Sequence, residues 1–178
     1  DMTGSGATRP RIAIIGTGGT IASRGQHPLE LTEYINHNDL YDLEALLALT
    51  PELNEVAEIV PVPYSAVQST AIGPEAWLDL KNTIEGAVEQ HHPDGIVVTH
   101  GTATLEETAY FLNVTLRIEC PVVLVGAQRP ATALSGDGNL NLVNAARTAG
   151  ASEARGLGVL VVLNDEVQAA REVTKTST

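Results

Sequence analysis

Three observations predict that this chain folds as an α/β domain, with a doubly wound, mainly parallel sheet and helices on both faces, in three layers. Short apolar runs alternate along the sequence with longer segments whose apolar residues recur at helical spacing. Aromatic residues make up only 3% of the chain and small aliphatic residues are abundant, which suits a parallel sheet packed between helices. At 178 residues the chain is long enough for one core and short for two. We expect a disordered or tag-derived leader at residues 1–10 and a single domain over residues 11–178.

The first part of the chain is expected to hold two strands separated by a loop and a helix. Arg11–Ile15 is an apolar run that ends at a glycine-rich turn. Ser23–Asn38 is polar and lacks an apolar period, so we expect a mobile loop there. Asp39–Leu49 offers an N-cap and a leucine-rich face before Pro51, which predicts a helix. Glu55–Val62 is expected to be the second strand.

Strands and helices are expected to keep alternating to the end of the chain. Pro74–His91 begins with a proline suited to a first helical turn, and its apolar face is expected to hold Trp77, Leu78, Leu80, Ile84 and Val88. The remaining expected elements are a strand at Gly95–Val98, a helix at Thr104–Leu116, a strand at Pro121–Val125, a loop over 126–138, a helix at Asn139–Ala149 and a last strand at Leu157–Leu163. This order predicts right-handed crossovers.

The charge of the chain narrows the kinds of partner. A formal net charge of −12 argues against binding to nucleic acid or to an anionic membrane, because both require basic surface. No apolar run approaches the length of a membrane span, and the first ten residues contain no apolar signal segment. We therefore expect a cytoplasmic protein whose partner is a small molecule or another protein.

Several residues with reactive side chains have simple structural interpretations. The lone Cys120 precedes an apolar run and is interpreted as a buried core thiol, with a catalytic cysteine as the alternative. His91 and His92 lie at a helix end, and no other ligand has suitable spacing, so no metal site is predicted. Glu106 and Glu107 fall in a first helical turn, where the helix dipole stabilises carboxylates.

Two further residues lie close to the predicted turns. His100 precedes the turn at Gly101 and is interpreted as a hydrogen-bonded structural histidine, with tuning of that turn as the alternative. Arg129 lies in a loop rich in glycine and proline, and we expect it to tie that loop to the sheet rather than to bind a charged ligand.

The turn after the first strand, Gly16–Thr20, offers two hydroxyls and backbone N–H groups that can approach a bound group closely. It does not fit a nucleotide motif, because Ile21 stands where a dinucleotide fingerprint needs glycine and the Gly-Lys-Ser/Thr of a phosphate loop is absent. An oxyanion site or a simple capped turn remains. A second turn supplies Thr102, and Lys175 is a candidate base for a threonine nucleophile or a solvated surface lysine.

Four motifs stand in order at predicted strand ends: Thr17–Ala22; Thr99–Thr102 with Leu105–Tyr110; Gly126–Pro130 with Asp137–Gly138; and Asn164–Asp165 with Val173–Thr176. With them the chain resembles the L-asparaginase/glutaminase amidohydrolase family over residues 11–178. The resemblance implies hydrolysis of the side-chain amide of L-asparagine, and often of L-glutamine, without a metal or organic cofactor. It also implies a homo-oligomer.

The resemblance also assigns roles to individual residues. Thr17 is similar to the family's primary nucleophile, which forms an acyl-enzyme that water resolves. Thr102 and Lys175 correspond to the second half of the site, and a loop tyrosine, Tyr34 with Tyr41 as the alternative, is expected near the nucleophile. The expected substrate-binding residues are Gly18, Ser69, Gly101 and Ala103, with Ser69 holding the substrate carboxylate.

Two departures from the family pattern bear on activity. The family has an aspartate at the position of Ala103, which binds the substrate's α-ammonium group and partners the lysine. We therefore expect strongly reduced activity from the sequence as written. The chain also ends at Thr178, without the smaller C-terminal domain that completes the site of a neighbouring subunit, as in a naturally short member or a fragment. A non-catalytic amino-acid-binding module and an amidohydrolase acting on another amide remain as alternatives.

Overall fold

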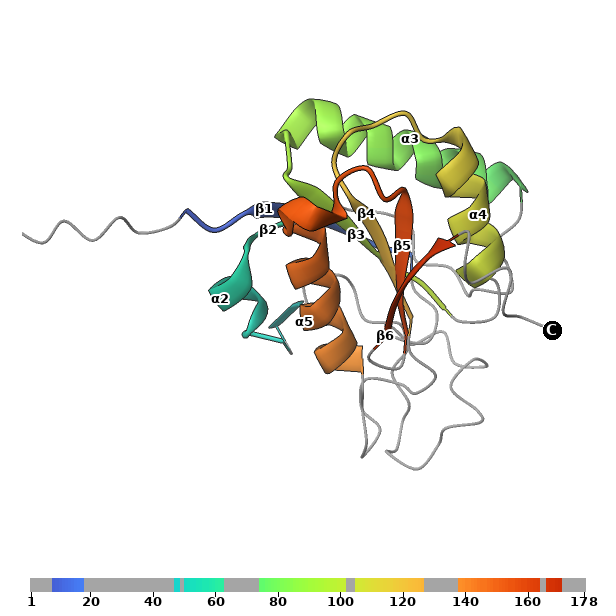
Figure 1. Cartoon of the computed structure of the whole chain (residues 1–178). Helices are drawn as coiled ribbons and strands as arrows, with labels where there is room; N and C mark the ends of the chain where they lie inside the picture. The colour runs from blue at the N-terminus through green and yellow to red at the C-terminus, as the bar shows by residue number, and fades with distance from the viewer. Residues whose placement is uncertain are drawn as a thin grey trace, which may run out of the picture.

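A six-stranded sheet forms the centre of the molecule, with helices on both faces (Figure 1). The computed structural model describes residues 8–17, 47–48, 50–62, 74–101, 105–126, 138–163 and 166–170. In the sheet the strands lie in the order β2-β1-β3-β4-β5-β6. Their bounds are β1 Arg11–Gly16, β2 Glu58–Val62, β3 Gly95–Thr99, β4 Val122–Val125, β5 Val159–Leu163 and β6 Glu166–Ala169. Strands β1 to β5 pair in parallel and β6 pairs antiparallel to β5, which confirms the predicted mainly parallel sheet.

The helices form the two outer layers. Helices α2 (Leu53–Val56) and α5 (Gly138–Ala149) cover one face, and α3 (Pro74–His91) and α4 (Leu105–Thr115) cover the other (Figure 1). Successive residues of β1 point to opposite faces. Ile12 and Ile14 therefore join the core cluster under α5, whereas Ala13 and Ile15 join the cluster under α3 and α4. No helix in the described parts of the chain is long and apolar enough to cross a membrane.

The strand order places β1 at the point where the winding of the sheet reverses. The chain moves from β1 outward to β2, then returns to β3 on the other side of β1 and continues outward to β5. In open sheets with the order 2-1-3-4-5, ligands bind beyond the carboxyl ends of the strands at this reversal. The residues that follow β1 and β3 are therefore placed where a ligand would bind.

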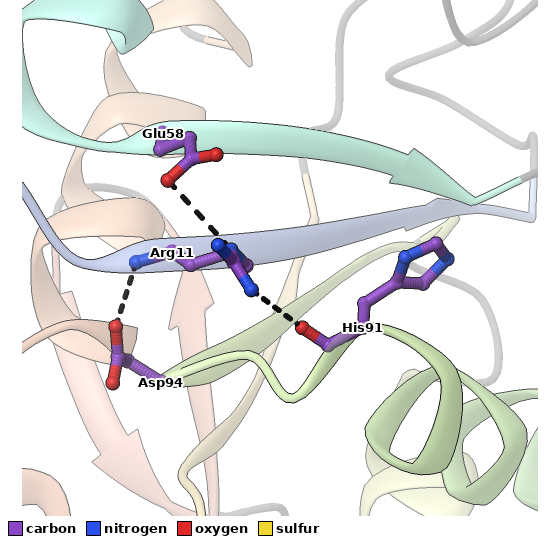
Figure 2. A network of polar contacts seen from close by, with 4 residues as sticks. All are labelled: Arg11, Glu58, His91 and Asp94. Atoms are coloured by element: carbon purple, nitrogen blue, oxygen red, sulfur yellow. Dashed lines mark hydrogen bonds and ion pairs between the residues drawn. The ribbon is translucent and has the colours of Figure 1, made fainter.

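At the other end of the strands, Arg11, the first residue of β1, ties together the amino ends of β1 and β2 (Figure 2). The backbone N–H of Arg11 donates a hydrogen bond to Asp94 Oδ2 at 2.8 Å, and its guanidinium donates to the His91 carbonyl at 3.0 Å. The guanidinium also lies 3.6 Å from the Glu58 carboxylate. These groups are exposed, so the ion pair adds little stability, but together they join β1, β2 and the end of α3.

Several expected elements differ from the structure at their ends. The expected strand at Glu55–Val62 begins only at Glu58, because the preceding residues form the one-turn helix α2. The expected strand at Leu157–Leu163 begins at Val159, since Gly156 and Gly158 have positive φ angles of 81° and 78°. A 3-10 turn at Ser152–Ala154 precedes it.

Three further expectations need correction or fall partly outside the described residues. The strand ending at Leu163 is not the last, because the antiparallel β6 follows it. Leu78 is 53% exposed and does not face the core, since it lies about 100° around the helix from its neighbour Trp77. Of the helix expected at Asp39–Leu49, only residues 47–48 are described, and these are helical, whereas the loop expected at Ser23–Asn38 lies outside the described residues.

Candidate functional site

Thr17 follows β1 directly and lies at the winding reversal of the sheet. Its side chain is buried, with 1% of its surface exposed. The Thr17 hydroxyl donates a hydrogen bond to the Thr99 carbonyl oxygen at 2.5 Å, and the Thr17 backbone N–H donates to the same oxygen at 3.1 Å. The carboxyl ends of β1 and β3 are therefore joined through this threonine.

Thr99, the last residue of β3, carries an unusual buried hydroxyl. Its residue surface is fully buried, and Thr99 Oγ1 has no hydrogen-bond partner within the described parts of the chain. A buried hydroxyl without a partner costs about 1–3 kcal/mol, and the described residues offer none to Thr99 Oγ1.

His100 follows Thr99 and is held by hydrogen bonds on both ring nitrogens. Nδ1 lies 2.5 Å from the Gly101 carbonyl oxygen, and Nε2 lies 3.0 Å from Thr108 Oγ1 on α4. Burial lowers the pKa of His100, and the Gly101 carbonyl and the charge of Glu107 oppose only part of that effect. These contacts agree with the interpretation of His100 as a hydrogen-bonded structural histidine.

Thr108 links His100 to a second helix. The indole Nε1–H of Trp77 on α3 donates a hydrogen bond to Thr108 Oγ1 at 2.9 Å, and the Trp77 ring stacks on Phe111 at 5.4 Å. Sequence reasoning did not identify this connection. The available signal was a threonine on the buried stripe of α4, among Leu105, Thr108, Ala109 and Leu112, where a hydroxyl requires a polar partner.

The described residues contain only part of the predicted site. Thr17 and Gly101 lie at the same carboxyl edge, and Gly101 is buried. The other predicted site residues lie outside the described residues; these are Gly18, Tyr34, Ser69, Thr102, Ala103 and Lys175. The alternative tyrosine, Tyr41, and the loop residue Arg129 also lie outside them. Glu106 and Glu107 occupy the first turn of α4, as expected from the helix dipole.

A separate cavity of about 370 Å³ lies at the amino ends of β4 and β5, away from Thr17. Cys120 lines it together with Arg155 and Asn113. Cys120 is half-buried rather than fully buried, and burial raises the pKa of its thiol, so it is a poor nucleophile. Among the described residues, no group of three or more His, Cys, Asp or Glu could hold a metal ion.

The fold and the site define a doubly wound α/β protein with a buried threonine hydroxyl at the winding reversal of its sheet. Comparison with known proteins identifies the family. The family model "Asparaginase, N-terminal" matches residues 11–178, so the chain belongs to the asparaginase family.

Individual relatives agree with this family. The chain is 48% identical to "L-asparaginase 2" of Bacillus subtilis over 95% of its length, and 43% identical to "Glutaminase-asparaginase" of Pseudomonas fluorescens over 92%. It is similar to the crystal structure of the probable cytoplasmic L-asparaginase of Campylobacter jejuni, with a TM-score of 0.83 and 41% identity. That match covers 92% of this chain and 48% of the Campylobacter chain. The chain covers 44% and 45% of the two curated relatives, or about half of their length.

Proposed function

We propose that this chain supplies the nucleophile of an amidohydrolase that converts L-asparagine to L-aspartate and ammonia. The observation that supports the proposal most directly is the burial of the Thr17 hydroxyl against Thr99, at the point of the sheet where ligands bind. The names of the Bacillus and Pseudomonas relatives suggest asparagine, with glutamine as a second substrate. A homo-oligomer and a cytoplasmic location remain predictions from the sequence.

In the proposed reaction, the Thr17 oxygen attacks the carbonyl carbon of the side-chain amide. The Thr17 hydroxyl proton is transferred to the leaving nitrogen, ammonia departs, and an ester joins the substrate to Thr17. Water then cleaves the ester and restores the hydroxyl. The carbonyl that accepts the Thr17 hydrogen bond is not a base, so another group must take the proton. We assign this task to Tyr34 and the activation of the second half of the site to Thr102 and Lys175.

The proposed substrate contacts surround the same edge. Ser69 holds the substrate carboxylate, and Gly18 and Gly101 offer backbone groups close to the amide. Ala103 cannot bind the α-ammonium group of the substrate, because it has no carboxylate. Leaving one member of a buried charge pair without its partner costs about 3–5 kcal/mol, so we expect activity to be strongly reduced.

Ala103 also favours a second candidate function. An amino-acid-binding module would retain the pocket but release no ammonia. It would bind asparagine or aspartate saturably, and restoring the carboxylate would increase binding without producing turnover.

The deciding experiment measures ammonia release from L-asparagine by the chain and by Ala103→Asp. Ala103→Asn is the matched control, because it has the shape of aspartate without the charge. Turnover in the aspartate form that exceeds both others supports the proposed amidohydrolase. Saturable binding without turnover in any form supports the binding module, and the absence of both from folded protein rejects the proposed site.

A further inference from the structure

Four groups form a continuous chain of hydrogen bonds from α3 to the end of β3. It runs from Trp77 Nε1 to Thr108 Oγ1 at 2.9 Å, from Thr108 Oγ1 to His100 Nε2 at 3.0 Å, and from His100 Nδ1 to the Gly101 carbonyl at 2.5 Å. Thr108 and His100 are fully buried. Water therefore does not replace these partners.

The two end groups of this hydrogen-bond chain, Trp77 and the Gly101 carbonyl, fix the direction in which its bonds are donated. The indole nitrogen of Trp77 can only donate, and the Gly101 carbonyl oxygen can only accept. His100 Nδ1 must therefore carry a hydrogen. A neutral imidazole then has a bare Nε2, which accepts the hydrogen of the Thr108 hydroxyl, while the Thr108 oxygen accepts from Trp77. For a neutral imidazole, all three bonds are satisfied only by this arrangement.

We propose that Trp77 and Thr108 lock His100 as its neutral Nδ1–H tautomer, and that His100 acts as a positioning residue for the turn after β3. The Gly101 carbonyl belongs to the same planar peptide group as the amide nitrogen of residue 102. A hydrogen bond that fixes this carbonyl therefore also fixes the direction of that N–H. The catalytic part of this inference rests on the proposed function, in which Thr102 supplies half of the site.

The tautomer is tested first, on the chain as it stands, by long-range ¹H–¹⁵N NMR of the imidazole nitrogens. We expect a protonated Nδ1 and a bare Nε2 for His100 at neutral pH. A protonated Nε2 would overturn the proposal. This measurement does not require activity, so it is independent of whether the chain hydrolyses asparagine.

Two substitutions separate the two sides of the imidazole. His100→Asn keeps a donor at the place of Nδ1 and loses the link to Thr108. His100→Gln keeps an acceptor at the place of Nε2 and loses the donor to Gly101. Each loses one buried hydrogen bond, so a purely structural role predicts similar losses of stability and similar effects on the turn.

The positioning role predicts different effects of the two substitutions. His100→Gln should shift the amide NMR signal of residue 102 more than His100→Asn does. In the Ala103→Asp background, His100→Gln should lower kcat by roughly 10- to 100-fold with little change in KM, and His100→Asn should lower it less. Equal signals and equal kcat values, compared per folded molecule, would reject the positioning role. If the Ala103→Asp background itself is inactive, the proposed function fails while the NMR comparison still decides this inference.

Discussion

The hydroxyl and the backbone N–H of Thr17 both donate hydrogen bonds to one atom, the carbonyl oxygen of Thr99, at 2.5 and 3.1 Å. The paired bonds hold the carboxyl ends of β1 and β3 together. A backbone carbonyl does not remove a proton, so the hydroxyl in this geometry is held but not activated. The proposed reaction requires its hydrogen to turn toward another group.

This relationship makes Thr17 testable in the Ala103→Asp background. Thr17→Val removes the proposed nucleophile and should abolish ammonia release, while the loss of one hydrogen bond should lower the free energy of unfolding by about 1 kcal/mol. Thr17→Ser keeps the hydroxyl and should retain part of the turnover. Ammonia release and urea unfolding of the two variants check the prediction, and turnover by the valine variant would exclude Thr17 as the nucleophile.

A matched pair of threonine-to-valine substitutions should have opposite effects on stability. Thr99→Val removes a buried hydroxyl for which the described structure offers no partner, and should raise the free energy of unfolding by about 1 kcal/mol. Thr108→Val leaves the Trp77 N–H and His100 Nε2 without their partner, and should lower it by roughly 2 kcal/mol or more. Urea titration measures both. A stabilised Thr108→Val would show that the hydrogen-bond chain contributes nothing.

Stability should decrease in mild acid because of His100. Burial lowers the pKa of His100 below its ordinary value of 6.5, so below that pH the unfolded chain binds a proton that the folded chain does not. The free energy of unfolding therefore falls as the pH falls below about 6.5, by at most about 1.4 kcal/mol per pH unit from this group, until the folded-state pKa is reached. Above about pH 6.5, His100 does not contribute to the pH dependence of the free energy of unfolding.

The control for this pH effect is His100→Gln, which cannot take up the proton. The difference between its unfolding free energy and that of the unchanged chain should vary with pH only below about 6.5. Parallel curves for the two proteins across this range would contradict the assignment of the effect to His100.

Two glycines offer a test of the packing at the start of β3. A Cβ atom on Gly95 would lie 2.1 Å from the backbone oxygen of Ala149, so Gly95→Ala should destabilise the fold by about 3 kcal/mol or more. Gly86 lies in α3 with nothing within 4 Å of an added Cβ, and Gly86→Ala should stabilise by roughly 0.5–1 kcal/mol. Thermal unfolding of both variants checks this contrast. Equal shifts of the Tm in the two variants would contradict it.

The sequence predicted the elements that have strong periodic patterns. The helix expected at Pro74–His91 is confirmed at both ends, and β1 and β3 each extend one residue beyond the expected runs. Helix α2 was missed because a single turn is too short to show a period. Strand β6 was missed because it is a short edge strand with little apolar alternation.

Less of the candidate site than of the fold could be predicted from the residues alone. The turns that contain Thr17 and Gly101 were predicted because they follow apolar strands, where open sheets bind ligands, whereas the roles of the two residues come from the family resemblance and remain predictions. The bond between Thr17 and Thr99 was not predicted, since strand pairing across 82 residues of sequence depends on the topology. The chain from Trp77 through Thr108 to His100 was also missed, because periodicity predicts which face a residue occupies but not its partner.

The pairing of β1 with β3 has a consequence for the folding kinetics. The β5–β6 pair joins neighbouring segments, whereas β1 and β3 must meet across a long intervening chain, which slows their encounter. We therefore expect Thr17 and Thr99 to come together in a late folding step. Trp77, the single tryptophan of the chain, contacts both Thr108 and Phe111, so its fluorescence can follow the packing of α3 on α4 during refolding. Amide protection at Thr17 that lags behind protection in β5 and β6 would show that the proposed nucleophile is positioned only after that part of the sheet has formed.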